Sequence, residues 1–514
     1  MYWAKELAKK IIKVKGKKIN IATGITPSGH IHIGNMREVM TAELVRREME
    51  VLGAKVRFIY IADDFDRLRK LYPFLPVSFQ KYIGWPLVNI PDPIGDCHKS
   101  YAEHFLAPFF EVLGKIGVKV EKFSAFKLYK EGFYTEQIKL ALENKDKIKK
   151  ILEEISGRSI PDDWSPYNPL CKSCGKIDEA KVLKEDLKSN RVFYKCSNCH
   201  ETGWADFSKG EGKLSWRVDW PARWNKFPVD FEPYGKEHAT LGGSYDTGKA
   251  ICEKIFGSPA PYGVGYDLIY LKGFKGKMSS SIGNVISANE FLEIVPPEIL
   301  RYLFVKTKND KPIYFDPGIG LLQLVDEYAK LEQKYFEKKA NQDEREIYEA
   351  CQIQKAGKSI PAIPFKHLVN TIQASQGNIK EIERILINTG HKKAISDQKM
   401  FDEQITRAKK WLEKYAPDNI KFSILKQTPK VNLDSAQKEM LNILSIDLAK
   451  KSWQAEELHN HIYEVGKRLG LSPKETFQPV YQVLIGKDHG PKAGWFIALL
   501  DKDFVIKRFI DITK

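Results

Sequence analysis

The segment ATGITPSGHIHIGNMREVM, residues 22–40, places three glycines and two histidines between an apolar run and a helical pattern. Backbone N–H groups at the start of a helix bind phosphate oxygens, and glycine lets the backbone come close to them. The side chains of His32 and Asn35 would add N–H donors at a fixed spacing. The segment therefore predicts a site for a nucleotide phosphate chain, and a tight turn with surface histidines is the alternative.

A second segment, GFKGKMSSSIGN at residues 273–284, carries a lysine and a row of hydroxyls between glycines. A movable ammonium such as that of Lys277, next to Ser279 and Ser280, suits an anion whose charge grows during a reaction, for instance leaving pyrophosphate. This segment also follows a predicted strand, YGVGYDLIYL at residues 262–271. We therefore expect the two segments to share one anion site.

The apolar runs around these segments predict a parallel sheet. Residues 19–25 and 55–65 have the composition of buried strands, and a helical pattern begins at Asn35. Its apolar face would consist of Met36, Val39, Met40 and Leu44. Such a strand–helix–strand unit is parallel, so we expect an α/β fold with a doubly wound, Rossmann-type sheet. Ligands bind at the carboxyl ends of its strands, where Asp63 and Asp64 also lie.

A chain of 514 residues is too long for one hydrophobic core, so several domains are expected. We predict a Rossmann-type catalytic domain at residues 1–90 and 216–290, interrupted by an insertion at 91–215. A helical connecting region at 291–356 and a helical domain at 357–514 would follow, because helical periodicity takes over there.

The net charge of +16 favours nucleic acid or another acidic surface as a partner, although solvated lysines would explain it equally well. The N-terminus lacks the apolar core of a signal peptide, and the late apolar run 493–500 is too short to span a bilayer. We therefore expect a soluble cytoplasmic protein with no membrane partner.

Four of the seven cysteines form two closely spaced pairs. The pairs Cys171–Cys174 and Cys196–Cys199 predict a closed, structural Zn²⁺ site with four thiolates, and a metal-free arrangement remains the alternative. His200 could substitute for Cys199, although the paired spacing argues against it. The remaining cysteines have no partner at ligand spacing and are expected to be ordinary buried thiols; they are Cys97, Cys252 and Cys351.

The two anion-binding segments resemble the signatures of class I aminoacyl-tRNA synthetases. His32-Ile33-Gly34-Asn35 is similar to the HIGH signature, with Asn35 in place of the final histidine, and KMSSS at 277–281 is similar to KMSKS. The stretches TGITPSGHIHIGNMRE, IADDFDRLRK, WRVDWPARW and GKEHATLGGSYDTGK resemble, more narrowly, the class I lysyl-tRNA synthetases. This resemblance implies ATP, Mg²⁺, L-lysine and tRNA(Lys) as reactants or partners, with lysyl-adenylate as the intermediate. It also implies an all-helical anticodon-binding domain and activation that needs bound tRNA.

The resemblance also implies site residues. His32, Asn35 and Lys277 would be catalytic. The ATP site would comprise Pro27, His32, Gly34, Asn35, Lys277, Met278, Ser279 and Ser280. The amino-acid site would comprise Gly24, Thr26, Trp220, His238 and Tyr266. Asp63 and Asp64 are added because the buried ammonium of a lysine substrate needs a carboxylate or an aromatic face.

A glutamyl-type synthetase and a non-catalytic RNA-binding paralogue are the two alternative functions. A glutamyl-type synthetase would need an arginine for its substrate, for which Arg37 or Arg217 is available, but the Asp63-Asp64 pair disfavours an anionic side chain. A non-catalytic RNA-binding paralogue would be expected to lack the HIGN or KMSSS residues.

The GxxxxGK pattern ending at Lys249 has alanine where a P-loop binds Mg²⁺. We expect its glycines to admit adenine or ribose, with Glu237 and Asp246 as hydroxyl partners.

Overall fold

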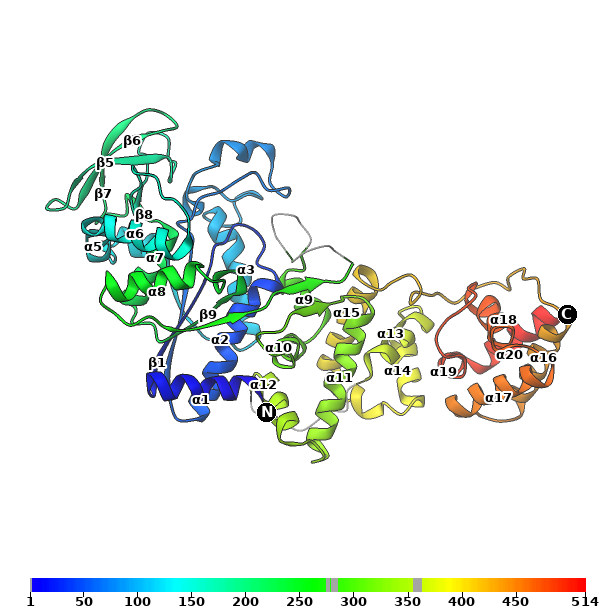
Figure 1. The fold of residues 1–514 in the computed structure, drawn as a ribbon. Coiled ribbons are helices and arrows are strands. Elements are labelled where there is room, and N and C mark those ends of the chain that lie inside the picture. The colour runs from blue at the N-terminus through cyan, green and yellow to red at the C-terminus, as the bar shows by residue number, and fades with distance from the viewer. Residues whose placement is uncertain (1, 274–277, 279–284, 355–362) are drawn as a thin grey trace. The chain divides into compact units, whose positions relative to one another are not determined.

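The computed structural model describes residues 2–273, 278, 285–354 and 363–514 (Figure 1). Lys277, Ser279 and Ser280, which are predicted to bind ATP, lie outside these residues. The chain forms two compact units. The first comprises Met1–Leu292, Pro296–Phe315 and Ala340–Ala356, and the second comprises Glu293–Val295, Asp316–Lys339 and Gly357–Lys514.

A five-stranded parallel sheet is the centre of the first unit. Its strand order is β10-β9-β1-β2-β3, and every neighbouring pair is parallel. The strands are β1 (Lys18–Ile25), β2 (Lys55–Ala62), β3 (Glu121–Ser124), β9 (Phe231–Gly235) and β10 (Tyr262–Tyr266). Because all five run in one direction, their carboxyl ends meet at one edge. The predicted parallel α/β fold is confirmed.

Helix α2 (Ile33–Val51) packs against β1, β2 and β9. Its expected apolar face is confirmed, because Met36, Val39, Met40 and Leu44 are all fully buried. Helix α1 (Trp3–Lys15) packs on α2 in turn. The register pairs Ile25 of β1 with Ala62 of β2, so the residues that follow these two strands start side by side. This register positions the glycine-histidine segment next to the aspartate pair.

Two strands of the sheet were not expected. Strand β9, with the sequence FEPYG, contains a glutamate and a proline, and β3 (EKFS) is short and polar, so neither has the apolar pattern of a buried strand. The predicted strand at 262–271 is in fact two strands, since β11 (Ile269–Leu271) leaves the sheet to pair with β12 (Ile313–Phe315). Strand β3 lies within 91–215, so the sheet continues into the range predicted as an insertion. The domain boundaries stay predictions.

The remaining elements before residue 316 surround the sheet or form the cysteine-bearing region. The helices are α3 (Tyr101–Lys115), α4 (Ala125–Lys130), α5 (Thr135–Glu143), α6 (Lys145–Ser156), α7 (Trp216–Lys226), α8 (Ser244–Lys254), α9 (Ala288–Ile294) and α10 (Pro297–Val305). The antiparallel strands are β4 (Tyr167–Pro169) with β8 (Gly212–Leu214), and β5 (Ala180–Asp186), β6 (Arg191–Cys196) and β7 (Thr202–Asp206) in that order. Helix α12 (Gln342–Cys351) also belongs to the first unit and packs on α10.

Every regular secondary-structure element among the described residues of the second unit is a helix. Its helices are α11 (Ile319–Phe336), α13 (Phe365–Ala374), α14 (Ile379–Asn388), α15 (Gln398–Lys414), α16 (Ser435–Lys450), α17 (Ala455–Arg468), α18 (Pro473–Ile485), α19 (Ala493–Leu499) and α20 (Lys502–Thr513). Helices α16 to α20 share one apolar core that includes Met440, Ile462 and Phe496. Across the described ranges, no helix has an apolar stretch long enough to cross a bilayer.

Candidate active site

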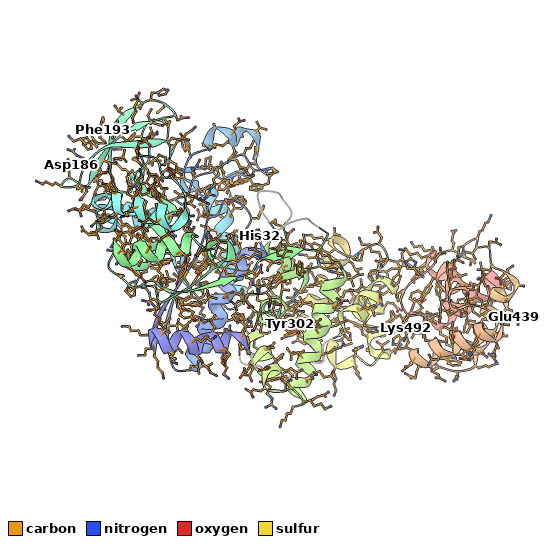
Figure 2. The ribbon with its side chains drawn as sticks, viewed as in Figure 1. His32, Asp186, Phe193, Tyr302, Glu439 and Lys492 are labelled. Carbon is orange, nitrogen blue, oxygen red and sulfur yellow. The ribbon has the colours of Figure 1, made fainter. Side chains whose placement is uncertain are left out.

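A cleft opens at the carboxyl edge of the parallel sheet, beside the first turn of α2, where His32 lies (Figure 2). Its walls come from the segment after β1, the residues that follow β9 and β10, and Met278. The lining residues are Ile25, Thr26, Ser28, Gly29, His30, Ile31, His32, Gly34, Asn35, Tyr72, Glu237, Tyr266, Leu268, Ile269 and Met278. Ligands of open parallel sheets bind at this edge.

The glycine-histidine segment is joined directly to the chain that follows the KMSSS residues. The N–H of Ile33 donates to the carbonyl of Ile286 at 3.1 Å, and the N–H of Ala288 donates to the carbonyl of Ile31 at 3.3 Å. Met278 is itself buried and lines the cleft with His32. Two segments that lie about 250 residues apart in sequence therefore meet at one cleft, and their shared anion site stays a prediction.

The first turn of α2 is shaped for close approach of an anion. Asn35 accepts a hydrogen bond from the backbone N–H of His32 through its Oδ1 at 3.2 Å, which leaves the Nδ2 hydrogens of Asn35 as donors. A β-carbon on Gly34 would stand 2.8 Å from the His32 ring, so only glycine admits this packing. Oriented N–H donors at a helix N-terminus suit a phosphate chain.

Tyr266 lines the cleft and is bonded to Glu38, a residue that sequence reasoning missed. The Tyr266 hydroxyl donates to Glu38 Oε2 at 3.1 Å, and the N–H of Gly24 donates to Glu38 Oε1 at 2.9 Å. Burial raises the pKa of Glu38 to about 8, although the bond from Gly24 opposes the rise. Glu38 therefore ties β1 to the residue that ends β10. Glu38 lies three residues after Asn35 and therefore on the same face of the helix, and this spacing is the sequence signal that could have identified it.

Asp63 and Asp64 are engaged with protein groups. Asp63 forms a buried ion pair with Arg223, and burial raises the pKa of Asp63 while Arg223 opposes that rise. Asp64 accepts hydrogen bonds from the Ser124 hydroxyl at 2.5 Å and from the N–H of Phe126 at 2.9 Å. These contacts fix the end of β2 against α4 and α7.

Thr26 belongs to the same buried network. Its hydroxyl donates to Asp66 at 2.7 Å, and the ammonium of Lys213 lies 2.6 Å from the other oxygen of Asp66. Burial alone would raise the pKa of Asp66, but Lys213 and Thr26 lower it below its ordinary value. The site wall after β1 is thus anchored to charged groups that are themselves paired, as buried charges must be.

An aromatic cluster lies beside the end of β9. The rings of Trp216 and Trp220 stack with centroids 5.2 Å apart, and the His238 ring lies 5.6 Å from that of Trp220. Trp220 donates through Nε1 to Glu232 at 2.9 Å. Trp220 is buried, whereas His238 is partly exposed and follows Glu237 of the cleft wall.

The structure brings together only part of the predicted constellation. Thr26, His32, Gly34, Asn35, Tyr266 and Met278 all line the cleft. A second set lies outside the described lining: Gly24, Pro27, Asp63, Asp64, Trp220 and His238. Of these, Gly24 and Asp63 adjoin each other, with Asp63 Oδ2 3.8 Å from the position of a Gly24 β-carbon. Tyr72 and Ser28 line the cleft without having been predicted.

The four paired cysteines converge near the β5–β7 sheet. The sulfurs of Cys171 and Cys199 lie 3.6 Å apart, and those of Cys174 and Cys196 lie 3.7 Å apart. With Zn–S bonds of about 2.3 Å, a tetrahedral Zn²⁺ would hold its sulfurs roughly 3.8 Å apart. All four cysteines are free thiols, and His200 is not a member of the cluster. The residues present fit a closed structural Zn²⁺ site.

The expectation for Cys97 was wrong. Cys252 and Cys351 are buried as predicted, but Cys97 is exposed. Its sulfur lies 3.1 Å from Asp92 Oδ2 and 3.3 Å from His104 Nδ1. The positions of these residues match no common ligand spacing, so their proximity is visible only in the folded chain.

The parallel sheet, its HIGN turn and the cleft that includes Met278 are the arrangement of a class I tRNA synthetase. A family model described as "tRNA synthetases class I (K)" matches residues 1–354, and one described as "Anticodon binding domain" matches residues 405–512. The chain belongs to the class I (K) tRNA synthetase family.

Curated relatives match along almost the whole chain. The chain is 44% identical to "Lysine--tRNA ligase 1" of Methanosarcina acetivorans, covering 99% of this chain and 98% of that protein. It is 40% identical to "Lysine--tRNA ligase" of Archaeoglobus fulgidus and 39% identical to the same-named protein of Pyrococcus horikoshii, each over 99% of both chains. The similarity therefore includes both compact units.

Proposed function

We propose that this chain is an ATP-dependent lysine–tRNA ligase, which forms lysyl-adenylate and transfers lysine to the terminal ribose of tRNA(Lys). The observation that carries the proposal is the meeting of two segments over one cleft. The N–H of Ile33 bonds to the carbonyl of Ile286, and His32 and Met278 line the same cavity. Family membership and the full-length similarity to curated lysine–tRNA ligases support the same conclusion.

In the first step, a carboxylate oxygen of lysine attacks the α-phosphorus of ATP and pyrophosphate leaves. The chain's part is to position both reactants and to stabilise the growing negative charge. His32 and Asn35 would donate to phosphate oxygens from the helix N-terminus, and Lys277 would approach the leaving pyrophosphate. Gly34 and Pro27 would shape the backbone there, and Met278, Ser279 and Ser280 would complete the ATP site. Mg²⁺ would neutralise part of the triphosphate charge.

Lysine would bind beside Thr26 and Tyr266, which line the cleft, and towards Gly24, His238 and Trp220, which lie outside its described lining. Since Asp63 and Asp64 are engaged with Arg223 and with the start of α4, their contribution would be to hold this wall in place. Among the described lining residues, Glu237 is the carboxylate that faces the cleft. We therefore propose Glu237 as a partner for the ammonium of lysine or for a ribose hydroxyl of ATP.

A glutamate substrate is disfavoured because Arg37 and Arg217, the arginines that could bind its carboxylate, are bonded to other groups of the protein. The guanidinium of Arg37 donates to the carbonyls of Lys308 and Lys311 at 2.8 Å each, and Arg217 donates to the Thr247 hydroxyl at 3.1 Å. The described residues that line the cleft include no arginine. A glutamate carboxylate would therefore lack the bidentate partner that such a site requires.

The helical second unit would bind the anticodon part of tRNA(Lys), since residues 405–512 match an anticodon-binding family model. The net charge of +16 would favour binding of the phosphate backbone. Structural Zn²⁺ in the four-cysteine cluster and a place in the cytoplasm belong to the same proposal.

Pyrophosphate exchange tests the proposal directly. The full-length chain would be assayed with each proteinogenic amino acid, with and without tRNA. The expected result is that lysine, and no other amino acid, supports exchange and that tRNA stimulates this exchange. Exchange with glutamate would identify a glutamyl-type enzyme, and an absence of exchange with every amino acid and tRNA would identify a non-catalytic RNA-binding protein.

A further inference from the structure

The three-stranded antiparallel sheet β5–β7 of the first unit has one buried face and one exposed face. Along β6, Val192, Tyr194 and Cys196 are buried, so the residues between them point to the opposite side. Cross-strand pairing adds side chains of β5 and β7 to that side. We call it the outer face and define it by Lys181, Lys184, Arg191, Phe193, Lys195 and Trp204.

Two aromatic rings lie side by side on the outer face. Phe193 of β6 (Figure 2) is the cross-strand partner of Trp204 of β7, and their ring centroids lie 5.3 Å apart. Both side chains are half-buried, whereas Tyr194 on the other face is buried. The guanidinium carbon of Arg191 lies 4.5 Å from the centre of the Trp204 ring. Accessible rings beside an arginine form a platform on which unpaired bases stack.

Three lysines share the outer face with the rings. Lys184 is paired across the sheet with Phe193, and Lys181 is paired directly with Lys195. Like charges directly opposite each other destabilise a sheet, so an anion has to offset this pair. Lys181 has such a partner, since its ammonium lies 2.5 Å from Asp163. The described residues include no carboxylate within ion-pair distance of Lys184 or Lys195, and both of these lysines are exposed.

The carboxylates at the margin of the outer face are engaged with other cations. Asp186 is the cross-strand partner of Arg191, and its carboxylate lies 3.1 Å from that guanidinium. Asp206, at the other side of Arg191, lies 3.2 Å from the ammonium of Lys209. Because each of these carboxylates has its own cation, the two lysines without an ion pair stay available for phosphates.

Rings and ammonium groups on one face match the chemistry of unpaired RNA. An unpaired base can stack on an aromatic side chain, whereas the bases of a duplex are covered by their neighbours. An acidic protein surface would satisfy the lysines but would leave the rings without a planar partner. We propose that the outer face binds unpaired nucleotides of tRNA, with bases stacked on Phe193 and Trp204 and phosphates paired with Lys184 and Lys195. This rests on the proposed function, because transfer of lysine brings the unpaired 3′ end of tRNA to the unit that contains this sheet.

Equilibrium binding of tRNA(Lys) by the full-length chain tests the stacking. Phe193→Leu and Trp204→Leu keep an apolar side chain but remove its π face, so each should weaken binding at least about fivefold. Phe110→Leu, which changes a half-buried ring of α3, is the matched control and should keep the affinity of the parent. Unfolding midpoints would be measured alongside, to show that each variant is folded.

The salt dependence of binding tests the phosphate contacts with exposed side chains only, so it stands even if a ring variant fails to fold. Each phosphate contact on a single strand contributes about 0.7 to the slope of log K against log salt. The double variant Lys184→Ala/Lys195→Ala should therefore lower that slope by about 1.4. Lys10→Ala/Lys13→Ala removes the same charge from the exposed side of α1 and should leave the slope unchanged.

A tRNA that lacks its unpaired 3′ nucleotides identifies which part of the RNA is bound. The parent should bind the truncated tRNA less tightly, and Phe193→Leu should then cause no further loss. An undiminished effect of Phe193→Leu on the truncated tRNA would support the proposal with other unpaired nucleotides on the outer face. Affinity and salt slope equal to those of the parent in every outer-face variant would overturn the proposal and favour a protein partner. These measurements do not depend on which amino acid the chain activates, so their failure is distinguishable from a failure of the exchange assay.

Discussion

The imidazole of His32 lies directly against the α-carbon of Gly34, so a β-carbon on Gly34 would meet the ring at 2.8 Å. Gly34→Ala should therefore displace His32 and lower pyrophosphate exchange at least about tenfold, because one misplaced phosphate donor costs that much or more. Gly114→Ala is the matched control, since it lies in α3 with no atom within 4 Å of its added carbon. The control should keep full activity and gain about 0.5–1 kcal/mol of stability. Equal activity in both variants would contradict the phosphate role of this turn.

Lys277→Ala should depress adenylate formation by about 10² to 10³, while ATP binding changes little, because the ammonium is expected to act on charge that develops in the transition state. Stopped-flow adenylate formation and equilibrium ATP binding would separate the two effects. Lys249→Ala is the comparison, since this exposed lysine ends the GxxxxGK pattern. A true P-loop would show the loss in Lys249→Ala instead.

The buried Arg223 pairs with Asp63 and lies 2.5 Å from Asp219. Arg223→Met should destabilise the chain by about 3–5 kcal/mol at neutral pH, because it removes the ion-pair partner of the buried Asp63 and leaves Asp219 with only Lys213, at 3.8 Å, as a cationic neighbour. The loss should shrink at lower pH, because burial raises the pKa of Asp63 and its carboxylate then takes up a proton. Urea unfolding at two pH values measures both effects. Lys209→Ala, which breaks an exposed pair with Asp206, should cost less than about 1 kcal/mol.

Glu38 gives a pH dependence whose sign can be stated. Its pKa is raised by burial from 4.5 to about 8, so between these values the folded chain holds a proton that the unfolded chain has lost. The free energy of unfolding therefore loses up to about 1.4 kcal/mol per pH unit from this group as pH rises. Glu38→Gln should remove that loss, so its stability relative to the parent should improve from pH 5 to pH 8. Unfolding midpoints of Glu38→Gln and of the parent would be measured at both pH values. Glu50→Gln, an exposed change on the same helix, is the control. A stability difference between Glu38→Gln and the parent that does not change with pH would contradict the inference.

The recognisable parts of the fold were those with a strong local pattern. Strands β1 and β2, the buried face of α2 and the paired cysteines all follow from periodicity or spacing, and the structure confirms them. Strand β9 was missed because Glu232 and Pro233 interrupt the apolar pattern expected of a buried strand. In the folded chain, the Glu232 carboxylate accepts hydrogen bonds from the N–H groups of two tryptophans. That compensation comes from α7 and cannot be read from the strand itself.

The sequence by itself determined the family and the chemistry, through the residue types of the HIGN turn, the KMSSS segment and the four-cysteine motif. Local backbone geometry and the identity of possible ligands depend on residues that are close in sequence. Only the tertiary structure decided which side chains reach the cleft. It engaged Asp63 and Asp64 in protein contacts, set Glu38 against Tyr266, and gathered Asp92, Cys97, His98 and His104 around one point. Such pairings depend on how distant elements pack, because the free energy of a buried charge depends on the partners that the fold supplies.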